Sequence, residues 1–88
     1  MDKKIEIYTV NYCPYCKKAV EFLKEHNINF KQIDITENET EMRHKLGEYY
    51  NIQGDVTVPQ IIVNGTRLGG YDAMMANQTA VLPQSSDN

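Results

Sequence analysis

The spacing of apolar positions predicts a strand–helix–strand unit in the first part of the chain. From about Lys4 to Val10 apolar and polar residues alternate, which is typical of a half-buried β-strand. From about Pro14 to His26 the apolar residues recur at helical spacing, and about Phe30 to Ile35 reads as a second strand. The apolar face of the predicted helix consists of Ala19, Val20, Phe22 and Leu23.

A second helix is predicted after the second strand. Thr36 and Asn38 are both candidate N-caps, and Thr36 with Glu39 fits a capping box. Acidic residues crowd the predicted helix start and basic residues follow, as the helix dipole favours. We expect this helix to bury one apolar face, formed by Met42, Leu46, Tyr49 and Tyr50.

The remaining pattern predicts a hairpin followed by a short helix. The apolar runs 59–63 and 66–68 flank Asn64-Gly65, which is the strongest short signal for a hairpin with a type I′ turn. Gly69-Gly70 ends the strand, and a helix is predicted over about Tyr71 to Asn77.

The predicted order β-α-β-α-β-β-α defines an α/β fold. A strand–helix–strand opening implies a right-handed parallel crossover, and the closing hairpin is antiparallel. We therefore expect a four-stranded mixed sheet with helices on both faces. The 88 residues suit one domain, 1–88, with a polar, frayed tail over residues 82–88.

Composition excludes some partners. The net charge of −3 comes without a basic patch, so nucleic acid is a poor partner. No apolar run approaches the ~20 residues of a membrane span. The opening residues lack the apolar segment of a signal peptide, so we expect a cytoplasmic, reducing location, where a lone cysteine pair is more often catalytic than structural.

The two cysteines carry the clearest chemistry. Cys13 and Cys16, the only cysteines, lie where the first predicted strand meets the first predicted helix. Free N–H groups and the dipole at a helix start favour a thiolate, so Cys13 should ionise more readily than a free cysteine, whose pKa is about 8.5. Pro14 suits the first helical position. We assign Cys13 as the nucleophile and Cys16 as the less exposed, resolving thiol.

Two other interpretations of the cysteine pair are less favoured. A structural zinc site needs four ligands, and His26 and His44 do not have the spacing of a second pair. His26 is better interpreted as a cation at a helix end, and His44 as part of a polar helix face. A structural disulfide is also disfavoured, because so short a ring removes little chain entropy.

Three separated blocks give the chain a resemblance to glutaredoxins, within the thioredoxin-like superfamily. Residues 13–16 (CPYC) match the dithiol active-site motif, residues 57–60 (TVPQ) resemble the segment with a cis proline, and residues 69–72 (GGYD) resemble the segment that opens the last helix. The blocks occur in the same order, and the match covers roughly residues 4–77.

The resemblance implies a glutathione site. Val58, before a cis Pro59, would pair its main chain with the cysteinyl part of glutathione, and N–H groups of residues 70–72 would meet the γ-glutamyl carboxylate. Asp72 could meet the ammonium group, although on its own it reads as an N-cap residue. The residues implied in binding are Tyr15, Thr57, Val58, Pro59, Gly70, Tyr71 and Asp72. Thr57 is the weakest of them, since a strand threonine is ordinary.

One departure from the family concerns a cation. Many glutaredoxins carry a lysine three residues before the first cysteine, and this chain has Val10 there. Lys17 or Lys18 could compensate, although both also read as part of a solvated helix face. Asn11 and Tyr12 are also unlike the commonest members.

The resemblance implies a glutathione-dependent thiol–disulfide oxidoreductase that acts on disulfide-containing or glutathionylated proteins, working as a monomer. It implies no metal and no tightly bound organic cofactor, with glutathione as co-substrate and NADPH as the ultimate electron source. Two alternatives stay open: a redoxin fed by thioredoxin reductase, and an iron–sulfur carrier in which two chains share a cluster.

Overall fold

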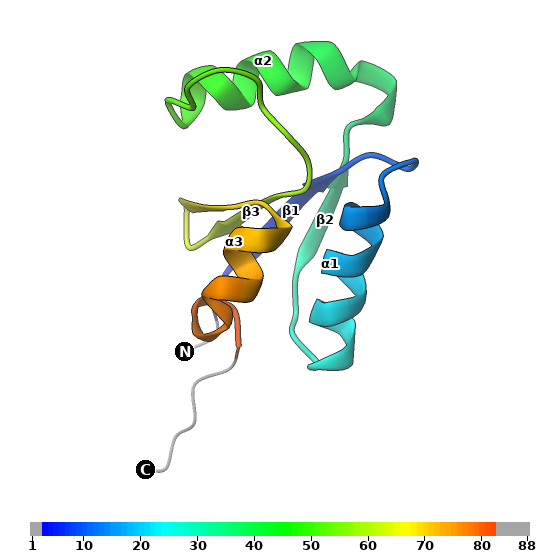
Figure 1. Cartoon of the computed structure of the whole chain (residues 1–88), viewed down its shortest axis with the longest axis vertical. Helices are drawn as coiled ribbons and strands as arrows, with labels where there is room; N and C mark the ends of the chain where they lie inside the picture. Colours follow the sequence, from blue (N-terminus) through cyan, green and yellow to red (C-terminus); the bar gives the residue numbers. More distant parts are fainter. Residues whose placement is uncertain (1–2, 83–88) are drawn as a thin grey trace.

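The computed structural model describes residues 3–82 and contains one mixed sheet with helices on both faces (Figure 1). The strands are β1 (Ile5–Thr9), β2 (Lys31–Asp34), β3 (Gln60–Val63) and β4 (Thr66–Gly69). The helices are α1 (Pro14–Glu25), α2 (Glu39–Tyr49) and α3 (Tyr71–Ala76), with 3₁₀ turns at Thr36–Asn38 and Gln78–Ala80. This order of strands and main helices confirms the predicted fold.

The sheet has the strand order β2-β1-β3-β4. β1 runs parallel to β2 and antiparallel to β3, so Ile7 lies between Gln32 and Ile61. The opening strand–helix–strand crossover therefore places β2 beside β1, as predicted. In Figure 1, α1 and α3 lie on one side of the sheet and α2 lies on the other.

The β3–β4 hairpin confirms the predicted turn. Asn64 and Gly65 have φ angles of 52° and 83°, and a type I′ turn requires positive φ at both central residues. The Asn64 side chain also accepts a hydrogen bond from the backbone N–H of Lys4 at 2.8 Å, which ties the turn to the start of β1.

The main core fills the space between the sheet and the two helices α1 and α3. Its buried side chains come from β1, α1, β3, α3 and the flanking segments. They are Ile5, Ile7, Ala19, Val20, Phe22, Leu23, Ile28, Ile61, Met74 and Val81. A smaller cluster of Val10, Cys16 and Ile35 lies beside the cysteine pair. This second cluster brings apolar surface to the place where the predicted chemistry lies.

The predicted capping box is wrong. Thr36 begins a 3₁₀ turn, and α2 starts at Glu39 without a side-chain cap on its amides. The Thr36 hydroxyl is occupied elsewhere, because it donates to Asp34 and accepts the backbone N–H of Asn11 at 2.9 Å. The hydrogen bonds from Thr36 also hold the pKa of the Asp34 carboxyl below its usual value.

The predicted buried face of α2 is partly wrong. Leu46 is buried and Met42 and Tyr50 are half-buried, but Tyr49 is 79% exposed. The two tyrosine rings contact each other edge to face, 4.7 Å between centroids. Tyr49 is therefore the residue for which the predicted buried face fails.

The ends of the described segment are tied together. Lys3 donates through its ammonium group to the carbonyl oxygens of Thr79 and Leu82. Leu82 packs against the main core, whereas residues 83–88 of the predicted tail lie outside the described residues. Within residues 3–82, no helix is both long enough and apolar enough to cross a membrane.

Candidate active site

Cys13 lies at the N-cap of α1, where the sequence predicted it. Its backbone is extended, Pro14 follows at the first helical position, and the Cys13 sulfur accepts the backbone N–H of Cys16 at 3.4 Å. The sulfur thus takes one of the amide protons that a helix start leaves unpaired. The start of α1 therefore presents a backbone N–H directly to the Cys13 sulfur.

Cys16 is the protected partner, as predicted. Only 2% of it is exposed, and it packs with Val10 and Ile35. Burial raises the pKa of the Cys16 thiol from its ordinary value of 9.0 to about 12. At neutral pH Cys16 therefore keeps its proton while it lies in contact with Cys13. Both cysteines are free thiols in this structure.

The segment before β3 approaches the partly exposed sulfur from the other side. The Cys13 thiol donates to the Val58 carbonyl oxygen, with 3.7 Å between the atoms. The Val58–Pro59 peptide bond is cis, as the resemblance implied. Val58 packs against the small apolar cluster around Cys16, and Thr57 is exposed.

A pocket of about 270 Å³ brings together every residue that the resemblance assigned to glutathione binding. Its walls come from the first turn of α1, the segment before β3, and the start of α3. The lining residues are Tyr15, Thr57, Val58, Pro59, Gly70, Tyr71, Asp72 and Ala73. The rings of Tyr15 and Tyr71 lie 5.7 Å apart, so the α1 and α3 walls meet there. Ala73 is the one lining residue that sequence reasoning missed.

The start of α3 differs from one prediction. Gly70, rather than Asp72, is the N-cap, and Asp72 lies exposed in the first turn. Gly69, directly before the N-cap residue Gly70, has a φ of 128°, a conformation that favours glycine. Asp72 is therefore not the helix cap, and it is one of the residues that line the pocket.

Gln60 is a supporting residue that sequence reasoning did not single out. It is only 3% exposed, and its side-chain amide donates to the Thr57 carbonyl oxygen at 2.8 Å. This bond fixes the segment that carries Val58. The available signal was a polar residue at the start of an otherwise apolar strand.

The position of the missing lysine is filled by apolar packing. Val10 is 2% exposed and belongs to the cluster that surrounds Cys16. Lys17 is exposed, and Lys18 places its ammonium group 5.2 Å from the centroid of the Tyr15 ring. The positive charge of Arg43 favours ionisation of Cys16, although burial outweighs it.

Metal-ligating groups do not gather in the described part of the chain. Within residues 3–82, no three His, Cys, Asp or Glu side chains lie where they could hold a metal ion. His26 is the C-cap of α1, where its ring contacts Phe22, and His44 lies on the exposed face of α2 beside Glu48.

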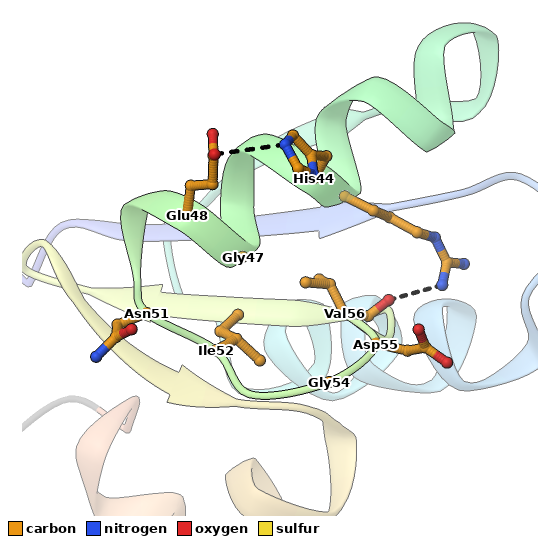
Figure 2. Close-up of a pocket in the computed structure, with 9 residues that line it drawn as sticks. His44, Gly47, Glu48, Asn51, Ile52, Gly54, Asp55 and Val56 are labelled. Atoms are coloured by element: carbon orange, nitrogen blue, oxygen red, sulfur yellow. Dashed lines mark hydrogen bonds and ion pairs between the residues drawn. The ribbon is translucent and has the colours of Figure 1, made fainter.

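A larger hollow of about 570 Å³ lies between α2 and the loop that leads to Val56 (Figure 2). It shares no lining residue with the pocket beside Cys13. Figure 2 shows Val56 as the acceptor of a hydrogen bond in this loop, and Arg43 is the donor. The hollow therefore marks where α2 holds the segment that leads into the site.

Comparison with known proteins agrees with this geometry. The glutaredoxin family model matches residues 5–68. Glutaredoxin 3 of Escherichia coli (strain K12) is 35% identical over 72 residues, which covers 82% of each chain. Glutaredoxin-C4 of Arabidopsis thaliana is 41% identical over 71 residues, covering 78% of this chain, which spans only half of that relative's length.

Solved structures show the same fold. Glutaredoxin 1 from Francisella tularensis, in complex with cacodylate, has a TM-score of 0.77 at 29% identity and covers 88% of this chain and 93% of its own. A buckwheat glutaredoxin–glutathione complex has a TM-score of 0.75 at 19% identity, covering 88% of this chain and 69% of its own. With its dithiol at the start of α1, the chain is a thiol–disulfide oxidoreductase and belongs to the glutaredoxin family.

Proposed function

We propose that this chain uses glutathione to reduce protein disulfides and glutathione mixed disulfides through Cys13 and Cys16. The observation that supports this most is the pocket beside Cys13, because all seven residues expected at a glutathione site line it. The glutaredoxin family uses glutathione as a partner, and the buckwheat relative of the same fold binds it.

The pocket offers a matching group for each part of glutathione. The Val58 main chain would pair with the cysteinyl residue like a short added strand, which holds the glutathione sulfur next to Cys13. The α3 start would meet the γ-glutamyl end, with Asp72 near the ammonium group. Tyr15, from the first turn of α1, would pack beside the glycyl end.

The first step is the attack of the Cys13 thiolate on a substrate disulfide. A bond forms between Cys13 Sγ and one substrate sulfur, and the other substrate sulfur leaves as a thiolate. With a glutathionylated protein, Cys13 takes the glutathionyl group and the protein thiol is released. A second glutathione then attacks that mixed disulfide, which yields oxidised glutathione and restores Cys13.

A protein disulfide needs Cys16 for the second step. Cys16 attacks the Cys13 sulfur of the mixed disulfide, the Cys13–Cys16 bond forms, and the reduced substrate leaves. The proton of Cys16 passes to the departing sulfur, because burial keeps Cys16 protonated until it reacts. Two glutathiones then return the enzyme to the dithiol, and NADPH regenerates them through glutathione reductase.

A coupled assay tests this proposal. NADPH oxidation is followed with a cysteine–glutathione mixed disulfide as substrate, once with glutathione and glutathione reductase and once with thioredoxin reductase alone. We expect turnover only in the first assay. Equal or faster turnover with thioredoxin reductase alone would establish the alternative reductant instead. A brown protein with visible absorbance after anaerobic purification would favour the cluster carrier.

A further inference from the structure

The loop that carries the nucleophile is anchored to α2 by side chains. The Tyr12 hydroxyl donates to the Glu39 carboxylate at 2.6 Å, and the backbone N–H of Asn11 donates to Thr36 just before α2. Tyr12 directly precedes Cys13, yet its ring is 63% exposed. An exposed ring gains little from packing, so the charge-assisted hydrogen bond is what fixes its direction.

The same carboxylate connects α2 to the segment on the other side of the sulfur. Glu39 forms an ion pair with Arg43 at 2.6 Å, and the second amino group of Arg43 donates to the Val56 carbonyl oxygen at 2.7 Å (Figure 2). Val56 lies two residues before Val58, whose carbonyl oxygen contacts Cys13. The contacts therefore form a closed circuit around the nucleophile.

We propose that Tyr12, Glu39 and Arg43 are positioning residues that fix the spacing between the Cys13 sulfur and the Val58 backbone. This deepens the proposed function, because the spacing matters when a glutathionyl substrate must pair with Val58 and offer its sulfur to Cys13 at once. A small displacement of the reacting sulfur relative to the backbone that binds the substrate is enough to weaken productive binding of such a substrate.

The Glu39–Arg43 ion pair is less exposed than the other ion pairs of α2. The Glu39 and Arg43 side chains are 23% and 31% exposed. The Glu41–Lys45 pair on the same helix is 64% and 62% exposed, and exposed pairs of this kind contribute little. The chain thus offers a matched control pair on one helix.

Double-mutant kinetics test the proposal. Tyr12→Phe keeps the ring and removes the hydroxyl, Glu39→Ala removes the carboxylate that accepts its hydrogen bond, and both are combined. We expect each single variant to raise KM for the cysteine–glutathione mixed disulfide at least about fivefold, because each variant loses the Tyr12–Glu39 hydrogen bond. The rates of catalysis at saturation and of Cys13 alkylation by iodoacetamide should stay within about twofold, because the sulfur itself is unchanged.

The combined variant distinguishes a network from independent contacts. Because the Tyr12–Glu39 bond is already lost in either single variant, the double variant should show a KM well below the product of the two effects. The controls Tyr49→Phe and Glu41→Ala, on exposed parts of α2, should leave KM unchanged. Melting temperatures of all variants identify any loss of folding at the assay temperature.

Three outcomes would overturn the proposal. One is an unchanged KM in Tyr12→Phe, and another is a KM change in the double variant equal to the product of the single effects. The third concerns Arg43→Met, which is measured both in the unmodified chain and in Tyr12→Phe. If it changed KM by the same factor in both, Arg43 would act on the substrate independently of Tyr12. Failure of the proposed function is distinct, since the unmodified chain would then show no glutathione-dependent turnover.

Discussion

The two cysteines differ in environment although they are separated by only two residues. Cys13 ends an extended segment and accepts a helix-terminal N–H, while Cys16 lies one turn inside α1 against apolar side chains. A sulfur at the N-cap lies at the end of the helix, whereas the side chain of Cys16, one turn later, lies on the buried face of α1. This local geometry supports the proposed roles, in which Cys13 attacks and Cys16 resolves.

Serine variants test this assignment. Cys13→Ser should abolish both activities, because no other sulfur is partly exposed at the helix start. Cys16→Ser should retain most activity on a glutathione mixed disulfide, and it should lose reduction of a protein disulfide by the two-thiol route. Reduction of the glutathione mixed disulfide is measured by NADPH oxidation in the coupled assay. Reduction of a protein disulfide is measured separately with insulin or another disulfide-containing protein as substrate. Similar losses of both reactions in both variants would contradict the assigned roles.

The environment of Cys16 also predicts how stability depends on pH. Between about pH 9 and pH 12 the unfolded chain has lost the Cys16 proton while the folded chain retains it, since burial raises the folded pKa to about 12. The unfolded state is therefore favoured as the pH rises, and the contribution is fully present below pH 9. The free energy of unfolding should fall more steeply with pH in the unmodified chain than in Cys16→Ala.

Urea unfolding under reducing conditions at several pH values between 8 and 11 measures that difference. Tyr8 and Tyr50, whose pKa values burial also raises, are common to both proteins, so their effects cancel in the comparison. Parallel pH profiles for the two proteins would show that Cys16 ionises alike in the folded and unfolded states.

At the scale of elements, the joint between β4 and α3 determines one wall of the pocket. Gly69 has a φ of 128°, and a Cβ at this position would lie 2.8 Å from the Cβ of Ala73 in the first turn of α3. A side chain therefore meets both backbone strain and a clash. The turn from β4 into α3 thus depends on glycine, and the pocket wall of residues 70–73 depends on the turn.

Gly69→Ala should lower the free energy of unfolding by about 2 kcal/mol or more, as expected for a residue forced into a glycine-only conformation. It should also raise KM for the mixed disulfide, because α3 must shift to relieve the contact. Gly54→Ala is the matched control: its φ is 73°, but nothing lies within 4 Å of the added Cβ. If both substitutions gave the same free energy of unfolding and the same KM, the contact with Ala73 would not affect stability or substrate binding.

Elements governed by neighbouring residues could be predicted, and those governed by distant partners could not. The Asn64-Gly65 turn and the start of α1 depend on local backbone preferences, and both are confirmed. Thr36 reads locally as a cap, but Asn11, 25 residues away, occupies its hydroxyl. The periodicity that pointed Tyr49 inward assumed a wide buried face, but Leu46 is the one residue of α2 that is fully buried.

The site shows the same division. The reactive pair follows from a strand–helix junction, whereas the pocket joins three segments that lie far apart in sequence, and only the resemblance to glutaredoxins brought them together beforehand. Within the Tyr12–Glu39–Arg43 network, the i,i+4 spacing of Glu39 and Arg43 is a local signal. The contacts from Tyr12 to Glu39 and from Arg43 to Val56 had none, because they depend on how α2 is placed relative to distant segments.

On the scale of the whole molecule, the two faces of the sheet are covered unequally. α1 buries five residues, including Phe22 and Leu23, against the sheet and α3. In α2, residues 39–49, Leu46 alone is buried. The polar contacts of Glu39 and Arg43 therefore contribute a larger share of what holds α2 in place. The side of the molecule that carries these contacts is also the side with the smaller apolar core.

The smaller number of buried residues in α2 predicts that this helix unfolds locally more readily than α1. Segments with few buried apolar contacts open with a smaller free energy than the core, so backbone amides in α2 should exchange with solvent deuterium faster than those in α1 and β1. Opening free energies are obtained by native-state hydrogen exchange at neutral pH, residue by residue. Equal opening free energies for the interior amides of α1 and α2 would show that the sheet and both faces unfold as one unit.

The same measurement connects α2 to the nucleophile loop. If Tyr12 helps to hold α2 through Glu39, Tyr12→Phe should lower the opening free energy of α2, because one hydrogen bond to that helix is lost, and leave α1 unchanged. Tyr49→Phe, which removes an exposed hydroxyl from α2 itself, should change neither helix. A drop in both helices with Tyr12→Phe would indicate general destabilisation, whereas a drop confined to α2 requires a direct link between the reactive loop and the far face of the sheet.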